Sequence, residues 1–264
     1  MAAEGIRFPS RILTISKNAF REAVRDRILY NLILFVLLIT ASAAFLGELT
    51  AGQEARVIVN LGLSSILIFG AFISIFVGVS LVWKEIEKRT VYSIFSKPIG
   101  RGEFIIGKYL GLCLTLLVNV VVMGVGVTLA LLYVGGGRFA VTIWPAILLI
   151  FLELTLLTAV AIMFSSFSTP ALSALLTFFV FLIGHFSSSL RALAQEMGST
   201  TARLVFDAVY YLLPNLSHFS FITETSNGMT PPPVMIEGSL LYALVYDMIV
   251  LTITVVIFSR RNFK

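Results

Sequence analysis

Long apolar stretches separated by short charged segments dominate the chain. Three of them carry no charged residue at all: residues 28–47, 57–83 and 109–137. Each provides the roughly 20 residues that a helix needs to cross a bilayer. Residues 139–190 contain one charged residue, Glu153, and a polar break at 165–170 divides them, because serine and proline clusters readily end helices. A last apolar stretch, 238–259, contains Asp247.

This pattern predicts an all-α integral membrane protein with six transmembrane helices. We place the spans at residues 28–47, 58–83, 109–134, 142–164, 171–190 and 238–259. The large outer loop at 191–237 joins the last two spans. Its apolar residues recur every three or four positions between 192 and 213, which indicates helices, and Arg203 and Asp207 make these helices too polar to span. We expect them to lie on the outer surface.

The segment before the first span, residues 1–27, separates its apolar and polar residues onto two faces of a helix that begins near Arg11. One face carries Ile12, Ile15, Ala19, Phe20, Ala23 and Val24. The other carries Asn18, Arg21, Glu22 and Arg25. An amphipathic helix with a basic face can lie in the headgroup layer, so we predict an interfacial helix. The alternative is a helix packed on the chain's own cytoplasmic loop.

Composition and charge support a membrane protein and give its orientation. Of the 264 residues 58% are apolar and 12% charged, whereas soluble domains are about 45–50% apolar and about 25% charged. With both termini in the cytoplasm, all but Arg56, Arg138, Arg191 and Arg203 of the 19 basic residues lie on the inner side. The net charge of +5 therefore reports topology and gives no support to nucleic-acid binding. We predict a single transmembrane domain, residues 1–264, in the cell membrane, retaining its first helix.

The stretch GEFIIGKY, residues 102–109, matches the phosphate-binding pattern G-x-x-x-x-G-K, but we expect no nucleotide there. Its middle is apolar, Tyr109 replaces the Ser or Thr that binds magnesium, and a membrane helix follows. Lys108 and Tyr109 are better explained as interfacial anchors of the third span. The preceding segment predicts a charged helix at 84–95 and a turn at 97–100. Such a helix could pass motion from a soluble partner to the bilayer, although a plain basic loop is the alternative.

The residues of this segment resemble a known family. Glu87-Lys88-Arg89-Thr90-Val91, Ser96-Lys97-Pro98-Ile99, Arg101, Glu103-Phe104 and Gly107 to Gly111 are similar to a motif of the ATP-binding-cassette (ABC) type-2 permeases. The order of the amphipathic helix, six spans, large last outer loop and short basic tail is also that of the family. One departure is the Lys88-Arg89 pair, where many relatives have a glycine before the threonine.

The resemblance implies a permease subunit, most often of an exporter, with a cytoplasmic coupling helix that docks on a separate ABC ATPase subunit. It implies contact with that ATPase by Glu85, Glu87, Arg89, Thr90, Tyr92, Lys97 and Arg101. It further implies a second copy of the chain or a related permease in the bilayer, no catalytic residue here, and ATP and magnesium on the partner alone. Residues lining the path are expected on the second and fifth spans: Ser64, Ser65, Phe69, Phe72, Ser74, Phe178, Phe179 and Phe181.

Two acids lie inside spans, Glu153 and Asp247, at a similar expected depth. Acids inside a membrane usually face protein or a wet cavity and are candidates for function. They could form a proton or cation site, which would favour a secondary transporter, or they could be hydrogen-bonded acids that hold helices together. A non-transporting membrane scaffold or an intramembrane enzyme is a further alternative.

His185 and His218 lack the additional ligands of a metal site, and the lone Cys113 excludes an intrachain disulfide.

Overall fold

The computed structural model describes residues 8–23, 34–35, 38, 52–87, 100–196, 204, 207–208, 210 and 213–260. Its elements are helical, and these residues contain no strand. In chain order they are α1 Phe8–Ala23, α3 Glu54–Phe72, the π-helical η2 Ile73–Val77, α4 Gly78–Glu87, α6 Arg101–Tyr133, α7 Gly137–Ser165, α8 Pro170–Glu196, the 3-10 helix η3 Leu216–Phe219, α10 Ile222–Ser226 and α11 Pro233–Arg260.

Five of the described helices are long and apolar enough to cross a membrane. One is the continuous rod of α3, η2 and α4, and the others are α6, α7, α8 and α11. They coincide with the predicted second to sixth spans. The predicted first span, 28–47, lies outside the described residues apart from Leu34, Phe35 and Leu38, as does the greater part of the predicted coupling helix. The first span and the coupling helix therefore stay predictions.

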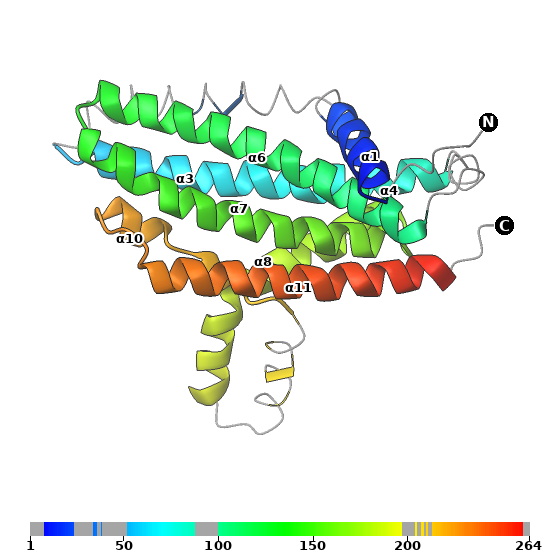
Figure 1. The fold of residues 1–264 in the computed structure, drawn as a ribbon. Coiled ribbons are helices and arrows are strands. Elements are labelled where there is room, and N and C mark those ends of the chain that lie inside the picture. Colours follow the sequence, from blue (N-terminus) through cyan, green and yellow to red (C-terminus); the bar gives the residue numbers. More distant parts are fainter. Residues whose placement is uncertain are drawn as a thin grey trace.

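Helix α7 is the centre of the bundle (Figure 1). It packs against α3, α4, α6, α8 and α11, and 78% of its most apolar stretch is buried, compared with 22% for α11. A helix that is apolar all round must be enclosed by other helices or by lipid. Helices α3, α6, α7 and α11 run side by side, whereas α8 crosses behind α11 and its C-terminal part projects from the bundle (Figure 1).

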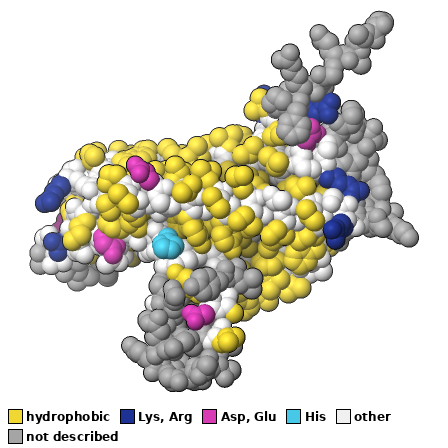
Figure 2. All heavy atoms as spheres, turned by 60° about the horizontal axis from the view of Figure 1, so that its bottom comes forward, with side chains coloured by type: hydrophobic (Ala, Val, Ile, Leu, Met, Phe, Trp, Pro, Cys, Tyr) yellow, Lys and Arg dark blue, Asp and Glu magenta, His cyan; other side chains and the backbone are white. Residues whose placement is uncertain are grey.

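The two ends of the bundle differ in charge. One end gathers α1, the C-terminal end of α4, the N-terminal end of α6 and the C-terminal end of α11, and we call it the basic end. The described lysines and arginines of these elements are Arg11, Lys17, Arg21, Lys84, Arg101, Lys108 and Arg260. The described basic residues of the opposite end are Arg56 and Arg138. Figure 2 shows a long hydrophobic surface with Lys and Arg side chains at both of its ends.

Helix α1 packs on α6 through glycines. The Cβ that an alanine at Gly111 would carry lies 2.6 Å from the Ala19 Cβ and 2.6 Å from the Ser16 carbonyl oxygen. The Ser16 hydroxyl also donates a hydrogen bond of 3.1 Å to the Gly107 carbonyl. Glycines four residues apart let two helix backbones approach closely. The structure thus forms the predicted helix, over Phe8–Ala23, with its buried residues against α6, while its place in the headgroup layer stays a prediction. These two glycines serve packing within the chain.

Part of the outer loop, around η3, packs between helices, whereas most of residues 192–213, where surface helices are predicted, lies outside the described residues. Leu216 and Phe219 of η3 are 0% and 1% exposed, and a Cβ at Gly184 of α8 would lie 2.8 Å from the Pro214 carbonyl oxygen. Polar backbone at this position needs partners inside the protein, since lipid offers none.

Asn215 provides these partners. Its side-chain oxygen accepts hydrogen bonds from the Ser187 hydroxyl (2.7 Å) and from the Ser217 N–H (3.2 Å), and its own N–H donates to the Tyr242 hydroxyl (2.9 Å). Tyr242 lies about 14 Å along α11 from Pro233, at about 1.5 Å per residue. The sequence contained no signal for this insertion, because the partners come from α8 and α11.

Replacing Gly111 with alanine is expected to destabilise the protein, because the added methyl group meets the backbone of α1. We expect a loss of roughly 1–3 kcal/mol, typical of overpacked sites, seen as a lower thermal transition of the purified protein. The control is Gly126→Ala in the same helix, whose nearest contact would be an ordinary 3.7 Å. That variant should match or exceed the native stability, and equal effects of the two changes would refute the packing argument.

Replacing Asn215 with alanine should also lower the thermal transition, since Ser187 and the Ser217 N–H lose their acceptor inside the bundle. An unsatisfied buried polar group costs about 1–3 kcal/mol. Asn227→Ala is the matched control, because the Asn227 side chain bonds only within its own exposed turn. If both asparagine variants melt alike, the inserted segment does not depend on Asn215.

Candidate coupling end and intramembrane polar sites

A buried lysine joins three helices at the basic end. Lys108 of α6 is 5% exposed, and its Nζ lies 3.0 Å from Glu22 Oε2 of α1 and 3.2 Å from Glu85 Oε1 of α4. The closeness of α1 and α6 at the two glycines places Glu22 within reach of this ammonium group. The three charges, which we call the Lys108 triad, tie α1 to the last turn of α4.

The start of α6 makes further polar contacts at the same end. The Glu103 carboxylate accepts a hydrogen bond of 2.8 Å from the Gly100 N–H, which satisfies a free donor at the helix N-terminus. Arg101 donates to the carbonyl oxygens of Phe258 and Ser259 in the last turn of α11. A cation is favourable there, because the C-terminus of a helix carries partial negative charge. Helices α6 and α11 are thereby joined at their ends.

The structure places three of the seven predicted coupling residues. Glu85 is in the Lys108 triad, and Glu87 is exposed at the end of α4. Arg101, the first residue of α6, bonds the last turn of α11. The other four, Arg89, Thr90, Tyr92 and Lys97, lie outside the described residues. Contact with an ATPase therefore stays a prediction for all seven.

The prediction that Lys108 and Tyr109 are interfacial anchors is wrong, because both side chains are buried and bonded within the bundle. The GEFIIGKY stretch lies wholly inside α6. Its backbone N–H groups serve the helix and its lysine binds two carboxylates. It therefore has neither the loop nor the free lysine of a phosphate site.

Asp247 of α11 is held by α6 and α7. Its Oδ2 accepts a hydrogen bond of 2.7 Å from the Tyr109 hydroxyl, and the Thr155 hydroxyl lies 3.3 Å from the same oxygen. Asp247 is 7% exposed. These contacts agree with an acid that holds helices together. Sequence analysis missed Tyr109 as the partner, because position 109 reads equally well as the aromatic end of a span.

Glu153 of α7 has a different partner. It is 1% exposed, and its Oε1 lies 3.2 Å from Nδ1 of His185 on α8. The Phe181 ring packs on the imidazole at 5.0 Å between centroids. The two acids lie at neighbouring levels, since Thr155 follows Glu153 by two residues, but they have separate partners. Sequence analysis weighed His185 only as a metal ligand, because spacing could not show that α8 brings it to Glu153.

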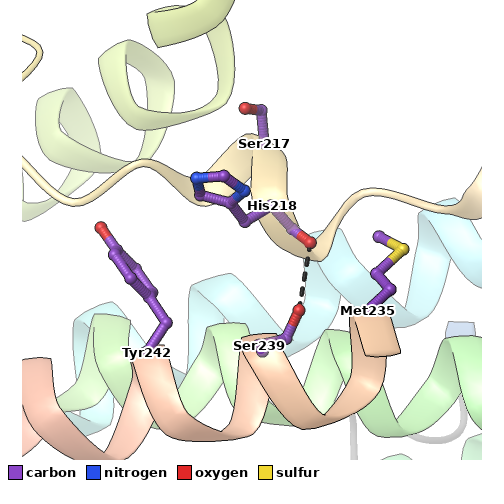
Figure 3. A pocket seen from close by; sticks show the side chains of 6 residues that line it. Ser217, His218, Met235, Ser239 and Tyr242 are labelled. Carbon is purple, nitrogen blue, oxygen red and sulfur yellow. Dashed lines mark hydrogen bonds between the residues drawn. The ribbon is translucent and has the colours of Figure 1, made fainter. Parts of the chain in front are cut away.

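Among the hollows lined by described residues, two concern the candidate sites. One, of about 460 Å³, lies between η3 and α11 and is lined by Ser217, His218, Met235, Gly238, Ser239 and Tyr242 (Figure 3). The His218 and Tyr242 rings lie 5.6 Å apart, and the Ser239 hydroxyl donates to the His218 carbonyl at 3.3 Å. Among the residues described, no three His, Cys, Asp or Glu side chains come together as a metal site would require.

The second hollow is an apolar groove of about 390 Å³ between the α3–α4 rod and α8. It is lined by Phe72, Ile75, Phe76, Ala171, Ala174, Leu175 and Phe178. Of the predicted path residues, Phe72 and Phe178 thus line one groove, and Phe179 is 47% exposed on the same helix as Phe178. Ser74 is instead fully buried and bonds to the Leu154 carbonyl at 3.4 Å.

Comparison with known families agrees with this arrangement. The family described as ABC-2 family transporter protein matches residues 13–263, from α1 to beyond the end of α11. The chain belongs to the ABC-2 transporter family. This confirms the resemblance drawn from residues 87–111. No curated protein matches the chain.

Because the ABC-2 match covers the whole bundle, it includes the basic end, both acids and both hollows. ABC-2 chains are transmembrane components of transporters, and the family is associated with ABC ATPases in general. The ABC-2 membership therefore directs attention to the basic end, where four elements meet, rather than to a catalytic centre in this chain.

Replacing Lys108 with methionine should leave the Glu22 and Glu85 carboxylates together without their cation. We expect a loss of roughly 1–3 kcal/mol of stability, moderated by the partial exposure of both acids. Adding Glu22→Gln and Glu85→Gln to the lysine variant should recover part of the lost thermal stability. The control is Lys17→Met, an exposed lysine of α1. The triad would be of no consequence if Lys108→Met and Lys17→Met melted at the same temperature.

Proposed function

We propose that this ABC-2 chain is the membrane-spanning permease subunit of an ABC exporter, driven by ATP that a separate subunit hydrolyses. The family match over residues 13–263 is the observation that supports this most directly. The fold agrees with it, because the phosphate-like stretch is part of a continuous helix and its lysine is engaged. ATP and magnesium then belong to the partner, and this chain supplies no catalytic residue.

The distribution of charge supports a cytoplasmic location for the basic end. Lysines and arginines are concentrated on the inner side of membrane proteins, and the described basic residues gather at this end. On this basis the chain lies in the cell membrane with both termini in the cytoplasm. The segment 88–99, which joins α4 to α6, then also faces the cytoplasm, where a soluble ATPase could reach it.

The contacts at the basic end support two roles for the predicted coupling residues. Glu87, exposed at the end of α4, is suited to touch the ATPase, together with Arg89, Thr90, Tyr92 and Lys97. Glu85 and Arg101 already bond within the chain. We assign them to transmission: a displacement of the coupling segment reaches α1 through the Lys108 triad and α11 through Arg101.

The apolar groove is where we place the substrate path and the contact with a second permease. Phe72 and Phe76 stack with ring centroids 6.0 Å apart and are 44% and 59% exposed. Phe178 faces the same groove from α8. We propose that a second copy of the chain, or a related permease, faces this side and that substrate passes between the two.

The test is to purify the tagged chain from its native membrane and to identify a bound ATPase that carries G-x-x-x-x-G-K-[ST]. The complex should hydrolyse ATP, and charge reversal by Glu87→Arg with Arg89→Glu should reduce ATPase binding at least tenfold, because the docking charges are inverted. Glu237→Arg, exposed at the start of α11 and remote from the basic end, is the control and should leave binding unchanged.

A proton- or cation-coupled secondary transporter is the second candidate, and the buried acids Glu153 and Asp247 favour it. The same preparation distinguishes the two. Uptake into liposomes by the chain alone, driven by a pH gradient and without ATPase, would overturn the ABC exporter.

A further inference from the structure

Five buried polar atoms of the described residues lack a hydrogen-bond partner, and two of them, Glu153 Oε1 and His185 Nδ1, face each other. Glu153 is 1% exposed, and neither its Oε1 nor the His185 Nδ1 has a hydrogen-bond partner with acceptable angles among the described residues. The two atoms nevertheless lie 3.2 Å apart, from helices α7 and α8. Two titratable side chains that face each other in this way, in a largely apolar bundle, require an explanation beyond packing.

The number of protons decides whether such a pair is tolerated. With one dissociable proton, the pair is neutral overall, either as carboxylic acid and imidazole or as carboxylate and imidazolium. With none, it carries a net negative charge, and a charge buried without compensation is strongly disfavoured. A hydrogen bond between the two facing atoms needs one of them to be a donor, and either the carboxylic acid or an Nδ1–H can be that donor.

We propose that Glu153 and His185 form a proton-binding site inside the membrane, with one dissociable proton held between Oε1 and Nδ1. Asp247 is not part of this site. The proton leaves and returns through the imidazole, because the His185 side chain is 25% exposed whereas that of Glu153 is 1% exposed.

The charged and titratable groups on the surrounding elements are engaged elsewhere or point outward. Asp247 of α11 bonds Tyr109 of α6, Glu85 of α4 bonds Lys108, and His218 of η3 packs on Tyr242. Cys113 of α6 is half-buried. Glu54 of α3 lies at the far end of its rod, and Glu224 of α10 is exposed. Among the described residues, His185 is the ion-pair partner found for Glu153.

The site also has a position from which it could influence transport. His185 lies two turns after Phe178, which lines the apolar groove from the same helix. Loss of the proton would place a bare carboxylate against α8 and weaken the α7–α8 contact, so occupancy would affect one wall of the groove. This consequence depends on the proposed function, whereas the proton site itself does not.

The experiment uses the purified chain in lipid nanodiscs, without ATPase or substrate. The sequence has two histidines, so His218→Gln leaves His185 as the one source of histidine ¹⁵N signals. We expect one titration step that appears at the same pH in the Nδ1 resonance and in the infrared carboxyl band of Glu153. The carboxyl band is assigned to Glu153 because it is lost in Glu153→Gln.

In Glu153→Gln the shared step should disappear and the Nδ1 resonance should move, while the thermal transition stays near that of the parent, since glutamine keeps the shape of the side chain. Asp247→Asn is the control and should leave the step in place. Should Glu153→Gln fold poorly, His185→Gln provides the same test through the Glu153 carboxyl band, whose titration should then shift.

Independent titration of the two groups at different pH, or an Nδ1 resonance that is the same with and without the Glu153 carboxyl, would overturn the proposal. Neither result would affect the assignment of the chain as an ABC permease subunit. Conversely, failure to find a partner ATPase would leave the proton site standing.

Discussion

Lipid offers no partner for a hydrogen bond, and this constraint bears on how the buried polar groups of the bundle are placed. Lys108, Asp247 and Asn215 are each nearly inaccessible to solvent, and each bonds side chains from other helices, although Asp247 does so through one oxygen, Oδ2. An apolar interior alone would let the helices slide and rotate, because hydrophobic contact has no direction. The polar contacts have direction, and they determine how α1, α4, α8 and α11 are arranged around α6 and α7.

Helix α6 concentrates these contacts in its first turns. Lys108 and Tyr109 are neighbours in the sequence, and successive helical residues point about 100° apart. The Lys108 ammonium group therefore reaches α1 and α4, while the Tyr109 hydroxyl reaches Asp247 of α11, an acid that Thr155 of α7 also bonds. Arg101 and Glu103 add the end of α11 and the start of α6 itself. A movement of this short stretch would displace contacts with α1, α4 and α11 directly, and with α7 through Asp247.

The sequence predicted the elements better than their partners. Long apolar stretches with at most one charged residue located five helices, and the apolar face of residues 12–23 predicted α1, because both are properties of one helix at a time. The pairing of His185 with Glu153, of Tyr109 with Asp247 and of Lys108 with two acids depends on which helices are neighbours. Spacing along one chain does not contain that information. The insertion of Leu216 and Phe219 was missed for the same reason: a short apolar run beside proline and serine is equally typical of a surface loop.

The π-helical segment η2 gives the α3–α4 rod a particular register. A π turn closes its hydrogen bonds over one more residue than an α turn does, so every residue after Val77 is rotated relative to an unbroken α-helix. Phe72 and Phe76 lie at this segment and open onto the groove, whereas Glu85 lies two turns later and meets Lys108. The additional residue thus sets the angle, measured around the axis of the rod, between the side that faces the groove and the Glu85 side chain. A relative that lacked it would need its acid at a different position to reach the same lysine, so insertions and deletions here should be accompanied by changes near position 85.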